Sequence, residues 1–72
     1  MECNEIKQRK ARFFLEKAIE VHINKLDKSF YNGFIITVNE HYFELNDRKL
    51  GRVPVYWDEI DNDSITEYRE RQ

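Results

Sequence analysis

Five short apolar runs, each bounded by turn-forming residues, occupy most of the chain after residue 20. Their β-branched and aromatic side chains recur at alternate positions, which is typical of half-buried β-strands. The runs are VHINKL, FYNGFIITV, HYFELND, RVPVYW and SITEYR. Five short strands joined by tight turns are typical of small barrels. The pattern therefore predicts a mainly β fold, a five-stranded, strongly bent antiparallel barrel, closed or nearly closed, over about residues 21–69.

One α-helix is expected before these runs, over about residues 5–20. The segment contains no Gly or Pro and is rich in helix-forming residues. Charged residues at helical spacing form a solvated stripe of Arg9, Arg12, Glu16 and Glu20. The remaining circumference is largely apolar, with Phe13, Phe14, Leu15, Ala18 and Ile19. This side is expected to pack against the rest of the protein, and Asn4 is the expected N-cap.

A lone glycine, Gly33, stands inside the longest run, directly ahead of a β-branched stretch. Glycine within a strand costs stability and offers no side chain to pack, so it usually marks a bend or a close approach of two backbones. We expect a strong bend of the second strand at Gly33. The alternation then predicts that Phe34, Ile36 and Val38 point inward, in phase with Phe30.

The chain has 72 residues, which predicts a single domain over 1–72 with a modest core filled mainly by aromatic rings. Its net charge is −2 at pH 7, with the acidic excess after residue 28. Non-specific electrostatic binding of nucleic acid by the protein as a whole is therefore not expected. A single cysteine, Cys3, excludes an internal disulfide, and neither a signal peptide nor an apolar run long enough for a membrane span is apparent. These features predict a cytoplasmic protein that does not enter membranes.

Catalytic and metal-binding motifs are not apparent. His22 and His41 are the only histidines, and no spacing typical of a metal site or of a nucleophile with its base includes them. The acidic segment after Trp57 lacks the glycine and spacing of a calcium loop, and a solvated loop is the simpler interpretation. We expect a protein that is not an enzyme and that has no metal, no cofactor and no small-molecule substrate.

The order of these elements resembles the Sm-like family, whose members have an N-terminal helix and a five-stranded SH3-like barrel. The similarity covers about residues 5–69 and is carried by Gly33, Ile35, Val38 and Leu45, while Asn39 stands where the family usually has Asp. The resemblance implies a homo-oligomer in which the fourth strand of one subunit pairs with the fifth strand of the next. Pro54, in the fourth run, cannot donate a ladder hydrogen bond and is expected at the start of its strand or at a bulge.

The resemblance also implies RNA binding by the turns before the third strand and after the fourth. Tyr42 and Phe43 replace the Met-Asn pair of the family there, and the segment 55–60 lacks its Arg-Gly pair. Aromatic rings can stack on bases without reading sequence. The candidate residues for weak binding of single-stranded RNA are Asn39, His41, Tyr42, Tyr56 and Trp57, with Arg9 and Lys10 on the helix.

A second interpretation of the same residues stays open. Trp57 and Tyr42 fill core or interface volume in that case, and the basic residues are a solvated helix face. Arg48, Lys49 and Arg52 form a second small basic group with the same two interpretations. The alternative function is an oligomeric scaffold or protein-interaction barrel without an RNA pocket.

Overall fold

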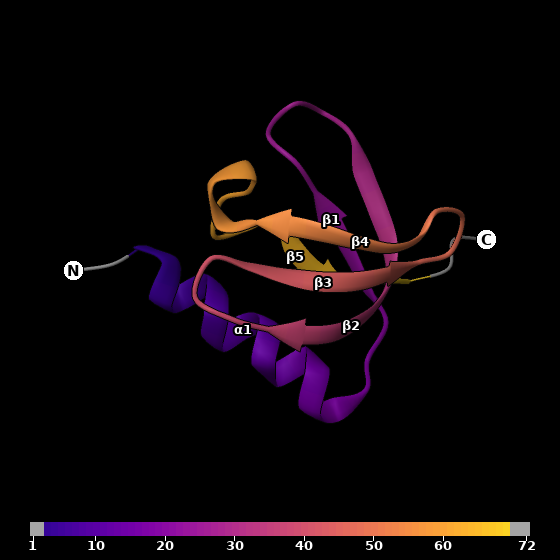
Figure 1. Cartoon of the computed structure of the whole chain (residues 1–72), viewed down its shortest axis with the longest axis horizontal. Helices are drawn as coiled ribbons and strands as arrows, with labels where there is room; N and C mark the ends of the chain where they lie inside the picture. The colour runs from indigo at the N-terminus through magenta and orange to yellow at the C-terminus, as the bar shows by residue number, and fades with distance from the viewer. Residues whose placement is uncertain (1–2, 70–72) are drawn as a thin grey trace.

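The computed structural model describes residues 3–69 and contains the helix and the five strands in the expected order (Figure 1). The elements are α1 (Cys3–Lys17), β1 (Val21–Asn24), β2 (Phe30–Val38), β3 (Tyr42–Asp47), β4 (Gly51–Tyr56), the 3-10 turn η1 (Trp57–Glu59) and β5 (Ile65–Glu67). The protein is thus mainly β with one helix. No helix among the described residues has the length and apolar character needed to cross a membrane.

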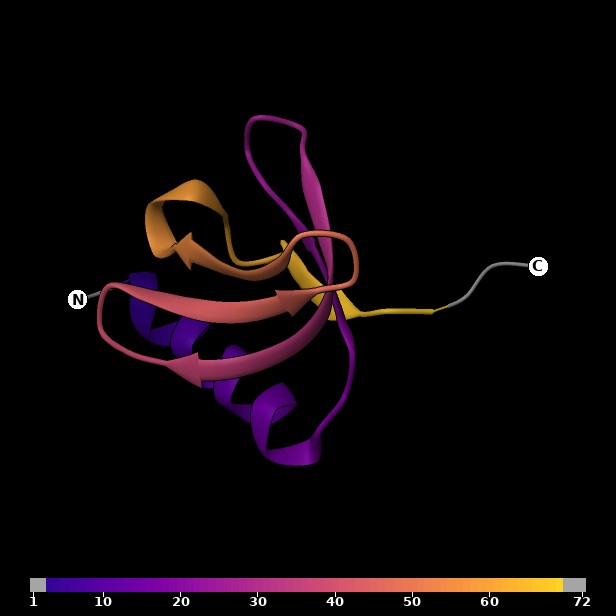
Figure 2. The same cartoon turned by 45° about the vertical axis from the view of Figure 1, so that its right-hand side comes forward.

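The strands form one antiparallel sheet in the order β4-β3-β2-β1-β5. Closing this sheet into a barrel would also require β4 to pair with β5. Within residues 3–69 these two strands are instead the edges of the sheet, so the prediction of a closed barrel is not confirmed and the sheet is open. Helix α1 packs on one side of it against β2 and β5, as two views of the chain show (Figures 1 and 2).

Strand β2 changes partners at Gly33. Its first residues pair with β1, ending at Val21↔Gly33, and its later residues pair with β3, beginning at Gly33↔Asp47. A Cβ atom on Gly33 would lie 1.9 Å from the carbonyl oxygen of Asn46. The glycine is therefore required by a close approach of two backbones, one of the two reasons expected from the sequence.

The inward face of β2 differs from the expected one. Ile35 is buried, whereas Phe34 is 47% exposed and Phe30 is 57% exposed. The pairing with β3 shifts register between Ile35 and Thr37, which lets Val38 pack against the core although it is three residues from Ile35. The expected inward direction is wrong for Phe34 and for Phe30, because both faces of this strand are apolar and alternation cannot tell which one the sheet buries.

Helix α1 begins and ends earlier than expected. Asn4 lies within the helix and is not its N-cap. At the other end, Ile19 N–H donates to the Phe14 carbonyl and Ala18 N–H to the Leu15 carbonyl, which is the Schellman arrangement. Ala18 has a φ of 55°, a position that glycine usually occupies. The sequence contains no glycine there, so the usual stop signal is missing.

The core lies between α1 and the inner face of the sheet. Its largest fully buried side chains are Trp57, Phe43, Ile23, Leu45, Ile60, Ile65, Val21 and Val55. The helix contributes Ala11, with Phe14 and Leu15 packed at the margin. Pro54 lies in the middle of β4, opposite Glu44, and not at the strand start or a bulge as expected. An edge strand tolerates proline because one side of it has no ladder partner.

Candidate nucleic-acid interface

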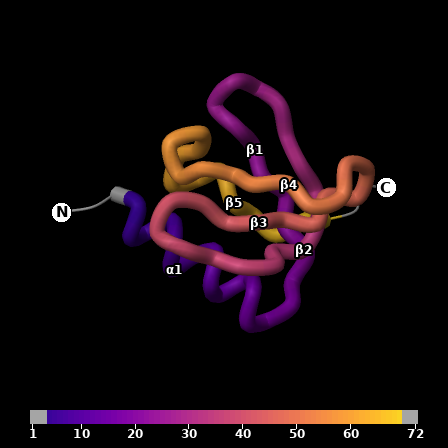
Figure 3. The backbone as a smooth tube through the Cα atoms, in the orientation of Figure 1, coloured from indigo at the N-terminus to yellow at the C-terminus, as the bar shows by residue number. Residues whose placement is uncertain are grey.

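The turn between β2 and β3 lies at the same end of the molecule as the start of α1 and the segment after β4 (Figure 3). Asn39 builds this turn. Its Oδ1 accepts hydrogen bonds from the backbone N–H groups of His41 and Tyr42, at 2.9 and 3.0 Å. Asparagine is common in turns because its side chain can bond its own backbone in this way. The Oδ1 of Asn39 is therefore engaged in structure and is not a free acceptor for a base.

Trp57 belongs to the core. It is 1% exposed, its ring centroid lies 5.1 Å from that of Phe43, and its Nε1–H donates to the Asn39 carbonyl at 3.1 Å. A buried ring with a satisfied N–H cannot stack on a base unless the core opens. The assignment of Trp57 to an RNA surface is corrected accordingly, and the interpretation of this ring as core volume holds.

Tyr42 and Tyr56 form an accessible aromatic pair. They face each other across β3 and β4, with ring centroids 5.1 Å apart and ring planes inclined by 52°. Tyr56 is 46% exposed and Tyr42 is half-buried. His41 is exposed beside them, with its Nε2 3.6 Å from a Glu40 carboxylate oxygen. These three residues are the part of the predicted RNA surface that the fold brings together and leaves accessible.

The cationic side chains of the helix differ in burial and in the groups that they contact. Lys10 Nζ donates to the Asn62 carbonyl at 3.1 Å, which ties the helix to the segment before β5. Lys7, a buried residue, donates to the Trp57 carbonyl at 2.8 Å. Arg9 is exposed and forms an ion pair with Glu5 at 3.5 Å. Two residues correspond to about 200° around a helix, so Arg9 is directed away from the side that Lys7 buries.

Acidic side chains surround this end of the molecule. Glu40 lies in the turn before β3, and Asp58, Glu59, Asp61 and Asp63 follow β4. Part of this charge is engaged, since Glu59 forms a 3.6 Å ion pair with Lys25. The remaining carboxylates oppose the binding of phosphate, so any nucleic acid here must gain its affinity mainly from stacking.

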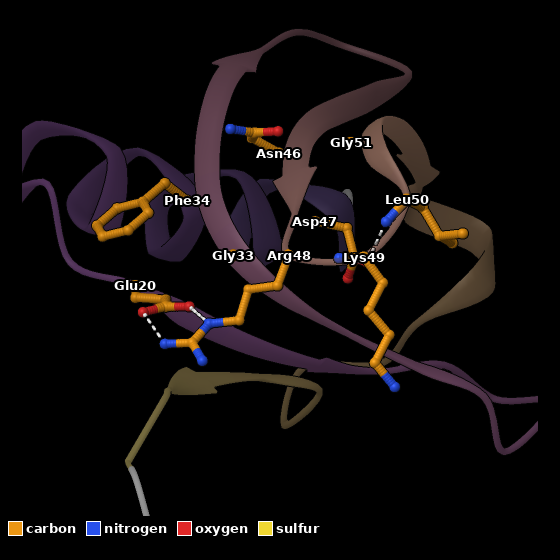
Figure 4. A pocket seen from close by; sticks show the side chains of 9 residues that line it. All are labelled: Glu20, Gly33, Phe34, Asn46, Asp47, Arg48, Lys49, Leu50 and Gly51. Carbon is orange, nitrogen blue, oxygen red and sulfur yellow. Dashed lines mark hydrogen bonds and ion pairs between the residues drawn. The ribbon is translucent and has the colours of Figure 1, made fainter.

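The loop between β3 and β4 lies at the opposite end of the molecule. Hydrogen bonds that the sequence did not predict hold this loop. The Asp47 carboxylate accepts backbone N–H groups of Asn32, Lys49 and Leu50, each at 2.9 Å. Figure 4 shows Asp47 beside the two loop residues, Lys49 and Leu50. Burial alone raises the pKa of Asp47, but these three donors outweigh it and hold the pKa below its usual 3.8. The sequence identified the basic residues of this loop, but it did not predict that the Asp47 carboxylate would hold the loop through backbone hydrogen bonds.

Among the described residues, no group of three His, Cys, Asp or Glu side chains is arranged to hold a metal ion. No known protein family, no curated protein and no solved structure matches the chain.

Proposed function

We propose that this chain is a non-catalytic Sm-like domain that binds single-stranded RNA weakly through the Tyr42–Tyr56 pair. The observation that carries the proposal is this accessible pair of rings on neighbouring strands. Stacking on aromatic rings is worth about 1–3 kcal/mol per base and tolerates most sequences. His41 and Lys10 are the proposed phosphate contacts at this end.

The arrangement of the strands supports the Sm-like assignment. The resemblance implies that the fourth and fifth strands pair between subunits, and β4 and β5 are the two edges of the open sheet. The resemblance also implies a second strand that turns at a glycine, and β2 changes partners at Gly33. In the proposed assembly, the β4 edge of one copy pairs with the β5 edge of the next copy, which joins their sheets.

The RNA proposal is tested by fluorescence anisotropy with oligo-U, oligo-A and mixed RNA at low and moderate salt. Tyr56→Ala is expected to weaken binding about 5- to 150-fold, the equivalent of one stacked base. Tyr56→Phe, which keeps the ring, is the matched control and is expected to bind like the wild type. Lys10→Gln is expected to reduce the slope of log affinity against log salt by about 0.7 if it contacts one phosphate.

Equal binding by Tyr56→Ala and Tyr56→Phe would contradict the role of this pair. No binding to any of the RNAs at low salt would contradict the RNA function itself. Arg9→Gln tests the other predicted cation of the helix, which is exposed and pairs with Glu5. A smaller salt slope would support a phosphate contact of Arg9, and an unchanged slope would remove Arg9 from the proposed interface.

A second candidate function, an oligomeric scaffold, is favoured by the open edge of β4. Unpaired edge strands promote association with further strands unless they are protected. Light scattering on a sizing column at micromolar concentration is the test, and we expect a homo-oligomer. A strict monomer would contradict both the scaffold and the assembly. An oligomer that binds none of the RNAs would make the scaffold the better proposal.

A further inference from the structure

A second accessible aromatic surface lies away from the Tyr42–Tyr56 pair, beside the β3–β4 loop. A cavity of about 400 Å³ is formed there by Phe30 and Asn32 of β2, by Arg48 and Lys49 of the loop, and by Tyr68. An adjoining hollow of about 610 Å³ lies against the same loop (Figure 4). Ligand sites in proteins are commonly hollows of about 300–1,000 Å³, so the cavity is large enough for a small group such as a nucleotide.

The walls of this cavity are held in place. Asp47 fixes the loop through its three backbone hydrogen bonds, and Arg48 N–H donates to the Asn32 carbonyl at 2.8 Å. Gly51 ends the loop with a φ of +80°. A loop held by its own backbone hydrogen bonds loses little conformational entropy when it binds a ligand.

An exposed ring and an exposed cation line this cavity. Phe30 is 57% exposed, and its ring centroid lies 5.5 Å from that of His22 on the neighbouring strand. The Lys49 side chain extends away from the loop and forms no ion pair within the described part of the chain (Figure 4). A flat apolar ring next to a solvated ammonium group matches a nucleobase attached to a phosphate.

The carboxylates next to the cavity are already engaged. Glu20 binds the Arg48 guanidinium through both of its oxygens, with Arg48 Nη2 to Glu20 Oε1 at 3.0 Å, and the same guanidinium lies 4.6 Å from the centre of the Tyr68 ring. Asp47, which also lines the cavity, accepts three N–H donors, and its negative charge interacts with Lys49. Fewer carboxylates face a cation here than in the acidic segment that follows β4, and this favours an anionic ligand at the β3–β4 end.

We propose that this cavity holds one nucleotide of a single-stranded nucleic acid, with the base on the Phe30 ring and the phosphate at the Lys49 ammonium group. A duplex does not fit this arrangement, because its bases are stacked on one another and expose no face to a surface ring. Asn32, whose Oδ1 lies at hydrogen-bond distance from His22 Nδ1, offers its amide as a donor to the base. The site does not depend on the Tyr42–Tyr56 pair. One subunit would then contact a nucleic-acid strand at two places, this cavity and the tyrosine pair.

The test is a titration of ¹⁵N-labelled protein with oligo-U and oligo-dU of about six nucleotides, followed by amide chemical shifts. We expect shifts at residues 30–32, 48–50 and 68 with at least one of the two strands. Comparing the two shows whether the ribose 2′-OH contributes. Phe30→Leu, which keeps an apolar side chain but loses the ring face, is expected to weaken binding about 5- to 150-fold. Lys49→Gln is expected to lower the salt slope by about 0.7.

Phe13 and Lys17 on α1 are matched controls. Phe13 is 51% exposed and lies 6.0 Å from the Lys17 ammonium group, so the pair has similar chemistry on the helix, outside the proposed site. Phe13→Leu and Lys17→Gln are expected to leave binding unchanged. Effects of the site variants no larger than those of the controls would overturn the proposal. Amide shifts confined to residues 39–42 and 56 would also overturn it, while leaving the Tyr42–Tyr56 proposal intact, and no binding at all would overturn both.

Discussion

Replacing Gly33 with alanine places a methyl group where the backbone of β3 already lies. The new Cβ would be 1.9 Å from the Asn46 carbonyl oxygen, against at least 3.4 Å for an ordinary contact, so the strands must separate by about 1.5 Å. Such a separation breaks backbone hydrogen bonds that are normally about 2.9 Å long. Two lost bonds cost about 1–3 kcal/mol and the overpacking another 1–3 kcal/mol, which gives about 2–6 kcal/mol in total.

That loss is large for a chain of this length, whose free energy of unfolding is expected to be about 4–11 kcal/mol. Gly33→Ala is therefore expected to lower Tm by about 8 °C or more, or to prevent folding. Urea unfolding followed by circular dichroism and by Trp57 fluorescence measures the change. Both signals report on the sheet and the core, so their transitions are expected to coincide.

Gly51 is the matched control, because its reason for being glycine is different. A Cβ there meets nothing within 4 Å, but the φ of +80° is unfavourable for a side chain. Gly51→Ala is expected to cost about 1–2 kcal/mol, and Gly51→Asn less, because asparagine tolerates this conformation. Gly33→Asn is expected to cost at least as much as Gly33→Ala. A Gly33→Ala variant as stable as Gly51→Ala would refute the argument from close backbone approach.

Three further predictions concern the helix end, the loop anchor and the core ring. Ala18→Gly is expected to raise the free energy of unfolding by about 1 kcal/mol in urea denaturation, because glycine adopts a φ of 55° without strain; a loss of stability would contradict this. The pKa of Asp47 in the folded protein lies below 3.8, the ordinary value that applies to the unfolded chain. The contribution of Asp47 to stability is therefore full above about pH 3.8 and is lost as the pH falls through the folded pKa. Asp47→Asn, which cannot accept all three hydrogen bonds, is expected to cost about 1–3 kcal/mol at neutral pH and to flatten the loss of stability in acid, measured by thermal unfolding at several pH values. Trp57→Phe is expected to lower Tm yet leave RNA affinity unchanged in the folded protein, since the ring is buried; an anisotropy titration that shows weaker binding with an intact fold would contradict its assignment to the core.

The candidate site could be predicted only in part. The sequence marked Tyr42 and Tyr56, and the fold places them face to face across two strands. It also marked Trp57, whose ring is buried in the core, and Arg9, which is exposed and whose contact with RNA stays a prediction. Aromatic residues near turns serve either the core or a ligand, and composition does not distinguish the two uses. The cavity beside Phe30 was missed because Phe30 was expected to point inward.

The sequence by itself determined the helix, the number of strands and their order along the chain, and it marked Gly33 as a special position. The elements follow from local periodicity and turn residues, which act between neighbours along the chain, whereas the contact that requires Gly33 is made with the Asn46 backbone of β3. Only the tertiary structure decided which face of β2 is buried, because Phe34 and Ile35 are both apolar and the pairing with β1 and β3 selects between them. It also decided that the sheet stays open between β4 and β5, since β5 pairs with β1, a strand distant in sequence, and not with its neighbour along the chain, β4.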